Sequence, residues 1–239
     1  MKKDDIAHFY DEFSKKQVRT GANERLISLY KRLQKLGLKS NSKILELGCG
    51  VGIFTGLLAK NKSVGIIEAV DLSGKSVAIA EKELQNKKNI QFAVADVVTY
   101  QPKNSDFDFI TLMDVIEHIP LDQHEALFGN LAQICTDKTR IAINIPNPQY
   151  IDFTRINHPE TLQVIDQEVY LFPLLQHFEK HHLELVFFEK YGIWEVEDYH
   201  FMVVRKKRVF ELKHLADQRN VSEKIVKKVT AKLDAIKYQ

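Results

Sequence analysis

A glycine-rich segment directly after a short apolar run is the feature that most restricts how this chain can fold. The run, Ile44–Leu47, has the length of a buried strand, and it leads into Gly48, Gly50 and Gly52. Glycine lets the backbone turn sharply and approach a ligand, because no Cβ is in the way. A helix expected over 53–60 would point its free N–H groups at an anionic ligand. The segment therefore predicts a strand, a ligand-binding loop and a helix.

The rest of the chain repeats this alternation between short apolar runs and helical periodicity. Strands are expected at residues 66–70, 90–95, 107–113 and 141–145, and helices at residues 75–86 and 123–134. After a helix at 168–180, strands at 183–188 and 200–205 are joined only by a loop, which favours antiparallel pairing. We therefore predict an α/β, Rossmann-like fold: a mostly parallel sheet with an antiparallel last strand and helices on both faces.

Helical segments are expected at both ends of this core. Residues 3–16 and 22–36 precede the first strand, and Asn220 with Glu223 resembles the cap of a last helix. Apolar residues make up 44% of the 239, enough for one α/β domain with appendages. The predicted organisation is an N-terminal helical cap at 1–38, a ligand-binding domain at 39–206 and a basic amphipathic helical extension at 207–239.

Membrane, secretion and metal signals are absent from the sequence. No apolar run has the length of a signal-peptide core or a membrane span. The two cysteines, Cys49 and Cys135, form neither a metal-ligand pattern nor a disulfide framework. We therefore expect a soluble, cytoplasmic protein without a metal site.

Positive charge is concentrated near the C-terminus. The chain has a formal net charge of +2, whereas residues 205–239 hold 11 Lys and Arg against 4 Asp and Glu, a difference of +7. Such a segment can contact an anionic surface or form a solvated helix face, and we favour the solvated face. Its apolar stripe would pack on the body of the protein or on a second copy, as in a homodimer.

The glycine spacing excludes two common nucleotide-binding loops. A dinucleotide fingerprint, G-x-G-x-x-G, would need a glycine at position 53, where the chain has Ile53. No Gly-Lys-Ser/Thr sequence is present, so the segment is not a P-loop either. The early third glycine, Gly52, therefore indicates another class of ligand.

Acidic residues end the second and third expected strands. Asp71, followed by Leu72, can accept hydrogen bonds from two vicinal ribose hydroxyls; the alternative is a helix cap. Asp96 can accept from an adenine amino group while the N–H of Val97 donates to the ring; the alternative is an ordinary turn. With the glycine loop upstream, we favour ribose binding for Asp71.

Residues 106–119 complete the pattern, with Asp-Val-Ile-Glu-His at positions 114–118. In order and spacing, the glycine loop, the acidic strand ends and this segment resemble the core of class I S-adenosylmethionine-dependent methyltransferases over residues 43–146. The similarity is greatest to the branch that includes ubiquinone-pathway, small-molecule and sugar O-methyltransferases. The resemblance implies a seven-stranded sheet, S-adenosylmethionine as the cofactor and methyl transfer as the activity.

The resemblance also implies individual roles at the cofactor site. Glu46 would orient the loop, and the three loop glycines would cradle the methionine end of the cofactor. Asp71 would bind the ribose. The remaining implied contacts come from Leu72, Asp96, Val97, Met113, Asp114 and Val115, the last three on the sulfonium side of the pocket.

An early Tyr-Asp pair on an N-terminal helix often closes over the cofactor in the same branch. Tyr10 and Asp11 stand at the matching position, which makes Tyr10 a further candidate for cofactor binding. The alternative for Tyr10 is a packing role.

A hydroxyl acceptor must lose its proton during methyl transfer, so a base is expected near the pocket. His118 and Asp114 are candidates within the motif, and His158 is a third, from the connection after the fifth strand. His118 can instead be structural, and Asp114 can instead form a wall of the pocket.

The connection at residues 146–166 is expected to recognise the acceptor, because ligands bind at long connections beyond the carboxyl ends of parallel strands. Trp194 and Tyr199 would add an aromatic wall. The stretch 147–150 resembles the Asn-Pro-Pro-Tyr box of enzymes that methylate amines of DNA bases or protein amides. It follows the wrong strand and lacks the second proline, so a nucleic-acid partner is not expected.

The leading functional prediction is methyl transfer from S-adenosylmethionine to a small molecule or sugar, at oxygen. One alternative is the same chemistry on RNA, protein or a lipid-linked glycan, reached through the basic tail. Another is a non-catalytic binding module that uses the terminal helix as its contact. The sequence carries no signature of the acceptor itself.

Overall fold

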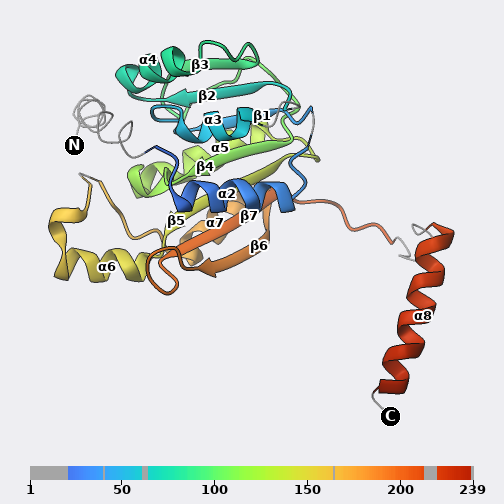
Figure 1. The fold of residues 1–239 in the computed structure, drawn as a ribbon. Coiled ribbons are helices and arrows are strands. Elements are labelled where there is room, and N and C mark those ends of the chain that lie inside the picture. The colour runs from blue at the N-terminus through green and yellow to red at the C-terminus, as the bar shows by residue number, and fades with distance from the viewer. Residues whose placement is uncertain (1–20, 40, 61–63, 164, 213–219, 238–239) are drawn as a thin grey trace. The chain divides into compact units, whose positions relative to one another are not determined.

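The computed structural model describes residues 21–39, 41–60, 64–163, 165–212 and 220–237 (Figure 1). The chain divides into two compact units between Lys207 and Arg208. The predicted helix at 3–16, with Tyr10, lies outside the described residues.

The first unit is built on one seven-stranded sheet with the order β3-β2-β1-β4-β5-β7-β6. The strands are β1 Ile44–Leu47, β2 Ile67–Asp71, β3 Ile90–Val94, β4 Phe109–Met113, β5 Arg140–Pro146, β6 Leu183–Tyr191 and β7 Tyr199–Lys206. Neighbours among β1 to β5 pair in parallel, whereas β7 pairs antiparallel with both β5 and β6. The predicted mostly parallel sheet with an antiparallel last strand is confirmed.

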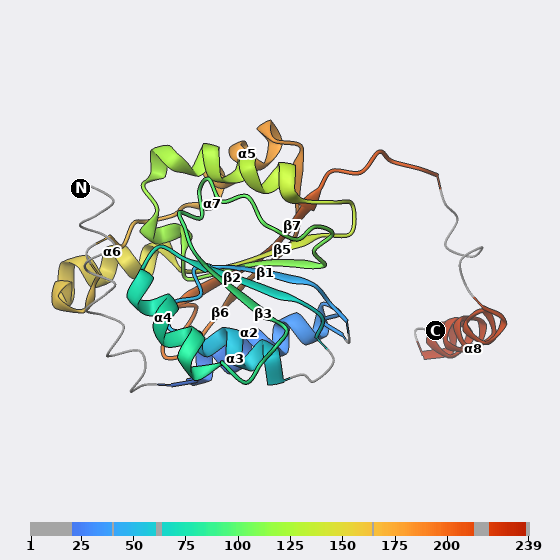
Figure 2. The ribbon, with the colours of Figure 1, turned by 90° about the horizontal axis from the view of Figure 1, so that it is seen from above.

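Helices cover both faces of this sheet, as predicted. Figure 2 shows α2, α3 and α4 on one face and α5 and α7 on the other. Their bounds are α2 Glu24–Lys35, α3 Ile53–Lys60, α4 Gly74–Glu83, α5 His124–Ile134 and α7 Leu171–Lys180. Side chains alternate between the faces: Ile44 packs in the cluster beneath α2 and α3, and Leu45 packs in the cluster beneath α5 and α7. Burial on both faces explains why β1 and β4 are almost continuously apolar.

The connection after β5 contains a helix that the sequence analysis did not anticipate. α6, Pro148–Asn157, begins where the Asn147 side chain accepts a hydrogen bond from the Gln149 N–H at 3.1 Å. Pro148 occupies its first turn, where a missing N–H costs nothing. The segment that resembled a recognition box is therefore a helix cap and first turn.

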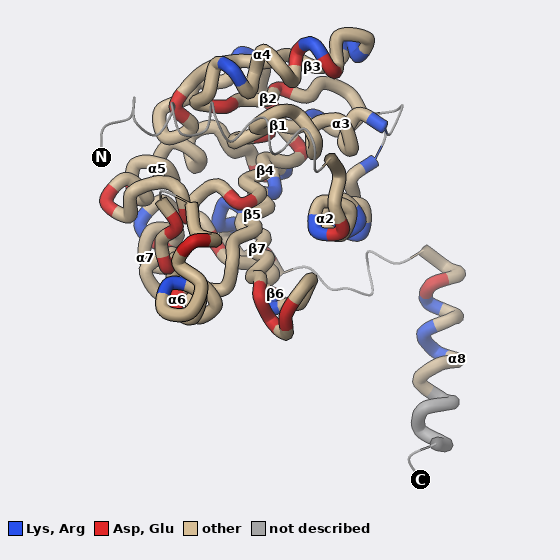
Figure 3. Tube along the Cα trace, turned by 60° about the vertical axis from the view of Figure 1, so that its left-hand side comes forward, with Lys and Arg blue, Asp and Glu red and all other residues tan. Residues whose placement is uncertain are grey.

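The second unit contains α8, Val221–Lys237. Its start is a reciprocal cap: the Asn220 side chain accepts from the Glu223 N–H at 2.9 Å, and the Glu223 carboxylate accepts from the Asn220 N–H at 3.2 Å. Lysines recur along the helix (Figure 3). Among the described residues, no helix combines the length and the apolar character of a membrane span.

Candidate functional site

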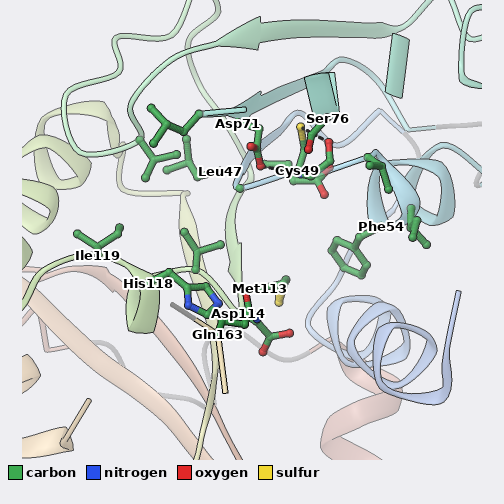
Figure 4. A pocket seen from close by; sticks show the side chains of 18 of the residues that line it. Leu47, Cys49, Phe54, Asp71, Ser76, Met113, Asp114, His118, Ile119 and Gln163 are labelled. Carbon is green, nitrogen blue, oxygen red and sulfur yellow. Dashed lines mark hydrogen bonds between the residues drawn. The ribbon is translucent and has the colours of Figure 1, made fainter. Parts of the chain in front are cut away.

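A cavity of about 370 Å³ lies where β1, β2 and β4 end (Figure 4). β1 has β2 on one side and β4 on the other, so the connections leave the sheet in opposite directions at this point. Such switch points are where open α/β sheets bind ligands. The predicted cofactor residues that line the cavity are Glu46, Gly48, Gly50, Asp71, Leu72, Asp96, Val97, Met113, Asp114 and Val115.

The glycine loop is shaped by two close approaches. Gly48 has a φ of +81°, and a Cβ added there would lie 2.4 Å from Cγ2 of Val115. Gly52 has a φ of +80°, and its Cβ would lie 2.8 Å from that of Ala80 in α4. Gly52 is not among the residues that line the cavity, and its close approach to Ala80 packs the loop against α4. The loop can therefore approach a ligand only because both positions lack a side chain.

Asp71, the last residue of β2, fixes the loop from the side. Its Oδ2 accepts a hydrogen bond from the Gly50 N–H at 2.7 Å, and its Oδ1 accepts from the Ser73 N–H at 2.9 Å. The cap of α4 is Ser73, whose side chain accepts from the Ser76 N–H. The helix-cap alternative for Asp71 is thus excluded. A carboxylate oxygen has two lone pairs, so it can accept from the backbone and from a ligand hydroxyl together.

Asp96 forms a turn, which was the alternative interpretation of this residue, and it also lines the cavity. Its Oδ1 accepts a hydrogen bond from the Val98 N–H at 3.0 Å, which shapes the chain after β3. Val97 lies between them and is buried. The two interpretations are compatible, because the turn holds Asp96 at the edge of the cavity.

Glu46 lies beneath the loop with only 3% of its surface exposed. Burial raises its pKa to about 8, aided by the nearby Asp71 charge and opposed by hydrogen bonding with Thr55. Its Oε2 has no hydrogen-bond partner within the described part of the chain. A buried, unpaired carboxyl oxygen at the wall of a cavity favours a ligand that donates a hydrogen bond or carries positive charge.

Asp114 follows β4 with a φ of +57°, a conformation that Asp tolerates better than most residues. Its Oδ1 accepts from the Asn144 amide at 2.7 Å, and Asn144 in turn accepts from the Tyr191 hydroxyl at 2.7 Å. Its Oδ2 forms an ion pair with Arg25 of α2. The carboxylate is therefore held by β5, β6 and α2 together.

Arg25 was missed by the sequence analysis, because a lone arginine in the first turn of a helix has no distinguishing signal. Its guanidinium lines the cavity and also donates a hydrogen bond to the Tyr199 hydroxyl at 3.3 Å. The guanidinium carbon lies 5.8 Å from the centre of the Trp194 ring. Trp194 and Tyr199, expected as a wall, do not line the cavity but support Arg25.

His118 lines the cavity but is engaged with the chain beyond α6. Its Nδ1 contacts the Ile165 carbonyl oxygen and lies 3.1 Å from Oδ1 of Asp166, and its Nε2 lies 3.9 Å from Oε1 of Glu117. Burial lowers the pKa of His118, but the two neighbouring carboxylates outweigh it and raise the pKa to about 9. The Nδ1 edge of the ring is therefore engaged with residues 165 and 166.

Residues 17–202 match the protein family described as methyltransferase domain. The chain belongs to this family.

Two curated relatives are similar to this methyltransferase-family chain. It is 30% identical over 134 residues to malonyl-[acyl-carrier protein] O-methyltransferase 1 of Ilyobacter polytropus. The aligned residues make up 56% of this chain and 47% of that protein. It is 29% identical over 125 residues to trans-aconitate 2-methyltransferase of Mycobacterium ulcerans. The aligned residues make up 52% of this chain and 44% of that protein. The chain spans less than half the length of these relatives.

A solved structure shares the fold of this methyltransferase-family chain. Magnesium protoporphyrin IX methyltransferase from Synechocystis PCC 6803, solved with bound SAH, matches with a TM-score of 0.61 and 16% identity. The match covers 82% of this chain and 87% of that one. The predicted class I methyltransferase fold is confirmed.

His158 does not line the pocket of this methyltransferase-family chain, so the geometry gives no support to the expectation that it is catalytic. His158 is the C-cap residue of α6, and 62% of its side chain is exposed. Its Nδ1 lies 3.8 Å from Oε1 of Glu160. The physical reason is the unanticipated helix, which fixes His158 at its exposed end. From the connection expected to recognise the acceptor, Gln163 lines the cavity instead.

Proposed function

We propose that the chain is an S-adenosylmethionine-dependent methyltransferase that methylates a small molecule at oxygen. The observation that carries this proposal is that Glu46, the glycine loop, Asp71 and Asp96 line one cavity at the switch point of the sheet. Family membership and the SAH-bound neighbour support the same cofactor.

In this proposal the cofactor extends along the ends of β1, β2 and β3. Asp71 would accept hydrogen bonds from the ribose, and Asp96 with Val97 would hold the adenine. An ammonium group near Glu46 would supply the partner that Oε2 lacks and would favour the carboxylate form. Arg25 has donors left beyond its bonds to Asp114 and Tyr199, and these suit the methionine carboxylate.

Methyl transfer would take place on the Asp114 side of the cavity. When bound, the cofactor supplies a methyl group on a positively charged sulfur, and the protein aligns the acceptor and excludes water. Of the predicted bases, Asp114 is favoured, because Nδ1 of His118 is already engaged with the Ile165 carbonyl oxygen and Asp166, and His158 does not line the cavity. An oxygen acceptor is supported by the relative named as an O-methyltransferase, and a small acceptor by the relative named for trans-aconitate.

The test is calorimetric titration of the full chain with S-adenosylhomocysteine. We expect measurable binding to the wild type and at least about a tenfold weaker affinity for Asp71→Asn, because a charge-assisted hydrogen bond is lost. Asp106→Asn, an exposed change away from the cavity, should bind like the wild type. Absence of binding to the wild-type chain would contradict the proposal.

A further inference from the structure

Gln163 presents a buried polar atom at the wall of the cavity. Its Oε1 is inaccessible to solvent and has no hydrogen-bond partner within the described residues. An amide oxygen that has lost its water and finds no replacement in the described part of the chain costs about 1–3 kcal/mol. A buried polar atom without a partner calls for an explanation, and a ligand in the cavity that Gln163 lines is one.

The backbone around Gln163 is fixed by Asp166. Oδ2 of Asp166 accepts a hydrogen bond from the Gln163 N–H at 2.6 Å, while its Oδ1 lies 3.1 Å from Nδ1 of His118. One carboxylate therefore joins Gln163 to the 3-10 helix Ile116–His118 that follows β4. The position of the Gln163 side chain depends on this connection.

Gln167 adds a second attachment to the same short helix. Its backbone N–H donates to the Glu117 carbonyl oxygen at 3.1 Å, and its side-chain amide donates to the Ile119 carbonyl oxygen at 2.6 Å. We refer to His118, Asp166 and Gln167 as the clasp. The clasp explains why His118 has carboxylate neighbours without needing a role in proton transfer.

The place of Gln163 in the cavity indicates what it would contact. In Figure 4, Gln163 lies with His118 and Asp114, on the opposite side of the cavity from Asp71. Apolar side chains, those of Met113, Ile119 and Pro120, line the cavity with it. This end is therefore an apolar pocket with a few polar groups, a combination that orients small ligands.

We propose that Gln163 recognises the methyl acceptor: its amide oxygen accepts a hydrogen bond from a hydroxyl on a small, otherwise apolar molecule. The clasp is the device that positions this amide, so His118 is a positioning residue rather than a catalytic one. This inference rests on the proposed function, because it places the acceptor on the Asp114 side of the cofactor. It assigns the acceptor class as small hydroxyl compounds with an apolar body.

The test compares phenol with toluene as probes, titrated by ligand-observed NMR into the full chain saturated with S-adenosylhomocysteine. Phenol has the apolar body and the hydroxyl, and toluene lacks only the hydroxyl. Gln163→Leu should weaken phenol binding by about 3- to 10-fold, the range expected for one lost hydrogen bond, and leave toluene binding unchanged. Gln163→Glu keeps an accepting oxygen and should retain phenol binding.

The clasp is tested with a matched pair of variants in one segment. Asp166→Ala should weaken phenol binding at least about threefold with an unchanged affinity for S-adenosylhomocysteine. Glu168→Ala removes an exposed ion pair with Arg155 and should change neither affinity. Equal phenol affinity in Gln163→Leu and wild type, or no phenol binding to the wild-type complex, would overturn the inference. Failure of the wild type to bind S-adenosylhomocysteine would instead overturn the proposed function.

Discussion

Arg25, in the first turn of α2, forms an ion pair with Asp114, which follows β4, and both residues line the pocket. Both side chains are largely buried, with 23% and 12% of their surfaces exposed. Two charges removed from water stabilise the fold only as a pair. The helix before the first strand is therefore part of the site.

Replacing Arg25 should destabilise the chain by leaving Asp114 as an unpaired buried charge. We expect Arg25→Met to lower the free energy of unfolding by about 3 kcal/mol, measured by urea denaturation. Asn at position 114 keeps the hydrogen bond with Asn144 within reach, tolerates the positive φ and carries no charge. The double variant Arg25→Met/Asp114→Asn should therefore recover most of the loss. A double variant as unstable as Arg25→Met alone would show that the pairing is not the cause.

Two glycines in adjacent elements give a matched comparison. Gly48→Ala should cost about 1–2 kcal/mol from its positive φ alone, and more because its Cβ would lie 2.4 Å from Val115. It should also abolish measurable binding of S-adenosylhomocysteine. Gly56→Ala, within α3, places a Cβ at an ordinary 3.5 Å from Leu84 and should stabilise by about 0.5–1 kcal/mol. Thermal unfolding and calorimetry check both, and equal effects of the two changes would argue against the geometry described for the loop.

Glu46 should make the ligand-free chain less stable as the pH rises. Its pKa in the folded state is raised from 4.5 to about 8, so folding favours the protonated form. Because the folded chain binds this proton more tightly than the unfolded chain, the free energy of unfolding falls as the pH rises from the unfolded-state pKa, near 4.5, to the folded-state pKa, near 8. Above pH 8 it stays low. Glu46→Gln should therefore unfold at a higher temperature than wild type at pH 9, by at least about 2 °C, with a small difference at pH 5.

The same substitution should weaken binding of S-adenosylhomocysteine by about tenfold, because a neutral amide cannot pair with an ammonium charge. The exposed Glu81→Gln is the control and should alter neither property. A pH-independent difference in unfolding temperature between Glu46→Gln and wild type would contradict this account of Glu46.

Removal of the second unit should leave the pocket intact. Its residues, from Arg208 onward, form a separate compact unit, and the described residues that line the cavity all precede it in the chain. A 1–207 chain is expected to bind S-adenosylhomocysteine within about twofold of the full chain. Light scattering of both forms tests the predicted homodimer: the full chain should have about twice the mass per particle of the truncated one. Equal association states would remove α8 as the dimer contact.

The fold could be predicted largely from sequence because its core signals are local and strong. Buried parallel strands such as Ile44–Leu47 and Phe109–Met113 are apolar almost throughout, and glycine marks the turn between strand and helix. The helix Pro148–Asn157 was missed although Asn147 and Pro148 are good starting residues. Its aromatic residues are exposed or half-buried and form no clear apolar stripe. The stretch 147–150 was instead interpreted through its resemblance to an Asn-Pro-Pro-Tyr box.

The sequence predicted the lining of the cavity more completely at the strand ends than elsewhere, for a topological reason. Glu46, Asp71 and Asp96 each lie in, end or closely follow a strand, so position along the chain determines position in space. Arg25 and Gln163 come from segments whose place depends on tertiary contacts, namely the ion pair with Asp114 and the hydrogen bond with Asp166. No local pattern encodes those contacts.

The place of the cavity at the switch point of the sheet has a consequence for how this protein can change. Apart from Arg25, every residue proposed to touch the cofactor lies in one uninterrupted stretch, from Glu46 to Val97, whereas Gln163 enters from outside it. The donor module and the recognition elements are thus separately mutable. If the proposed function holds, grafting a different segment between β5 and α7 should change the acceptor and leave cofactor binding unchanged, which makes that segment the place to engineer a new substrate.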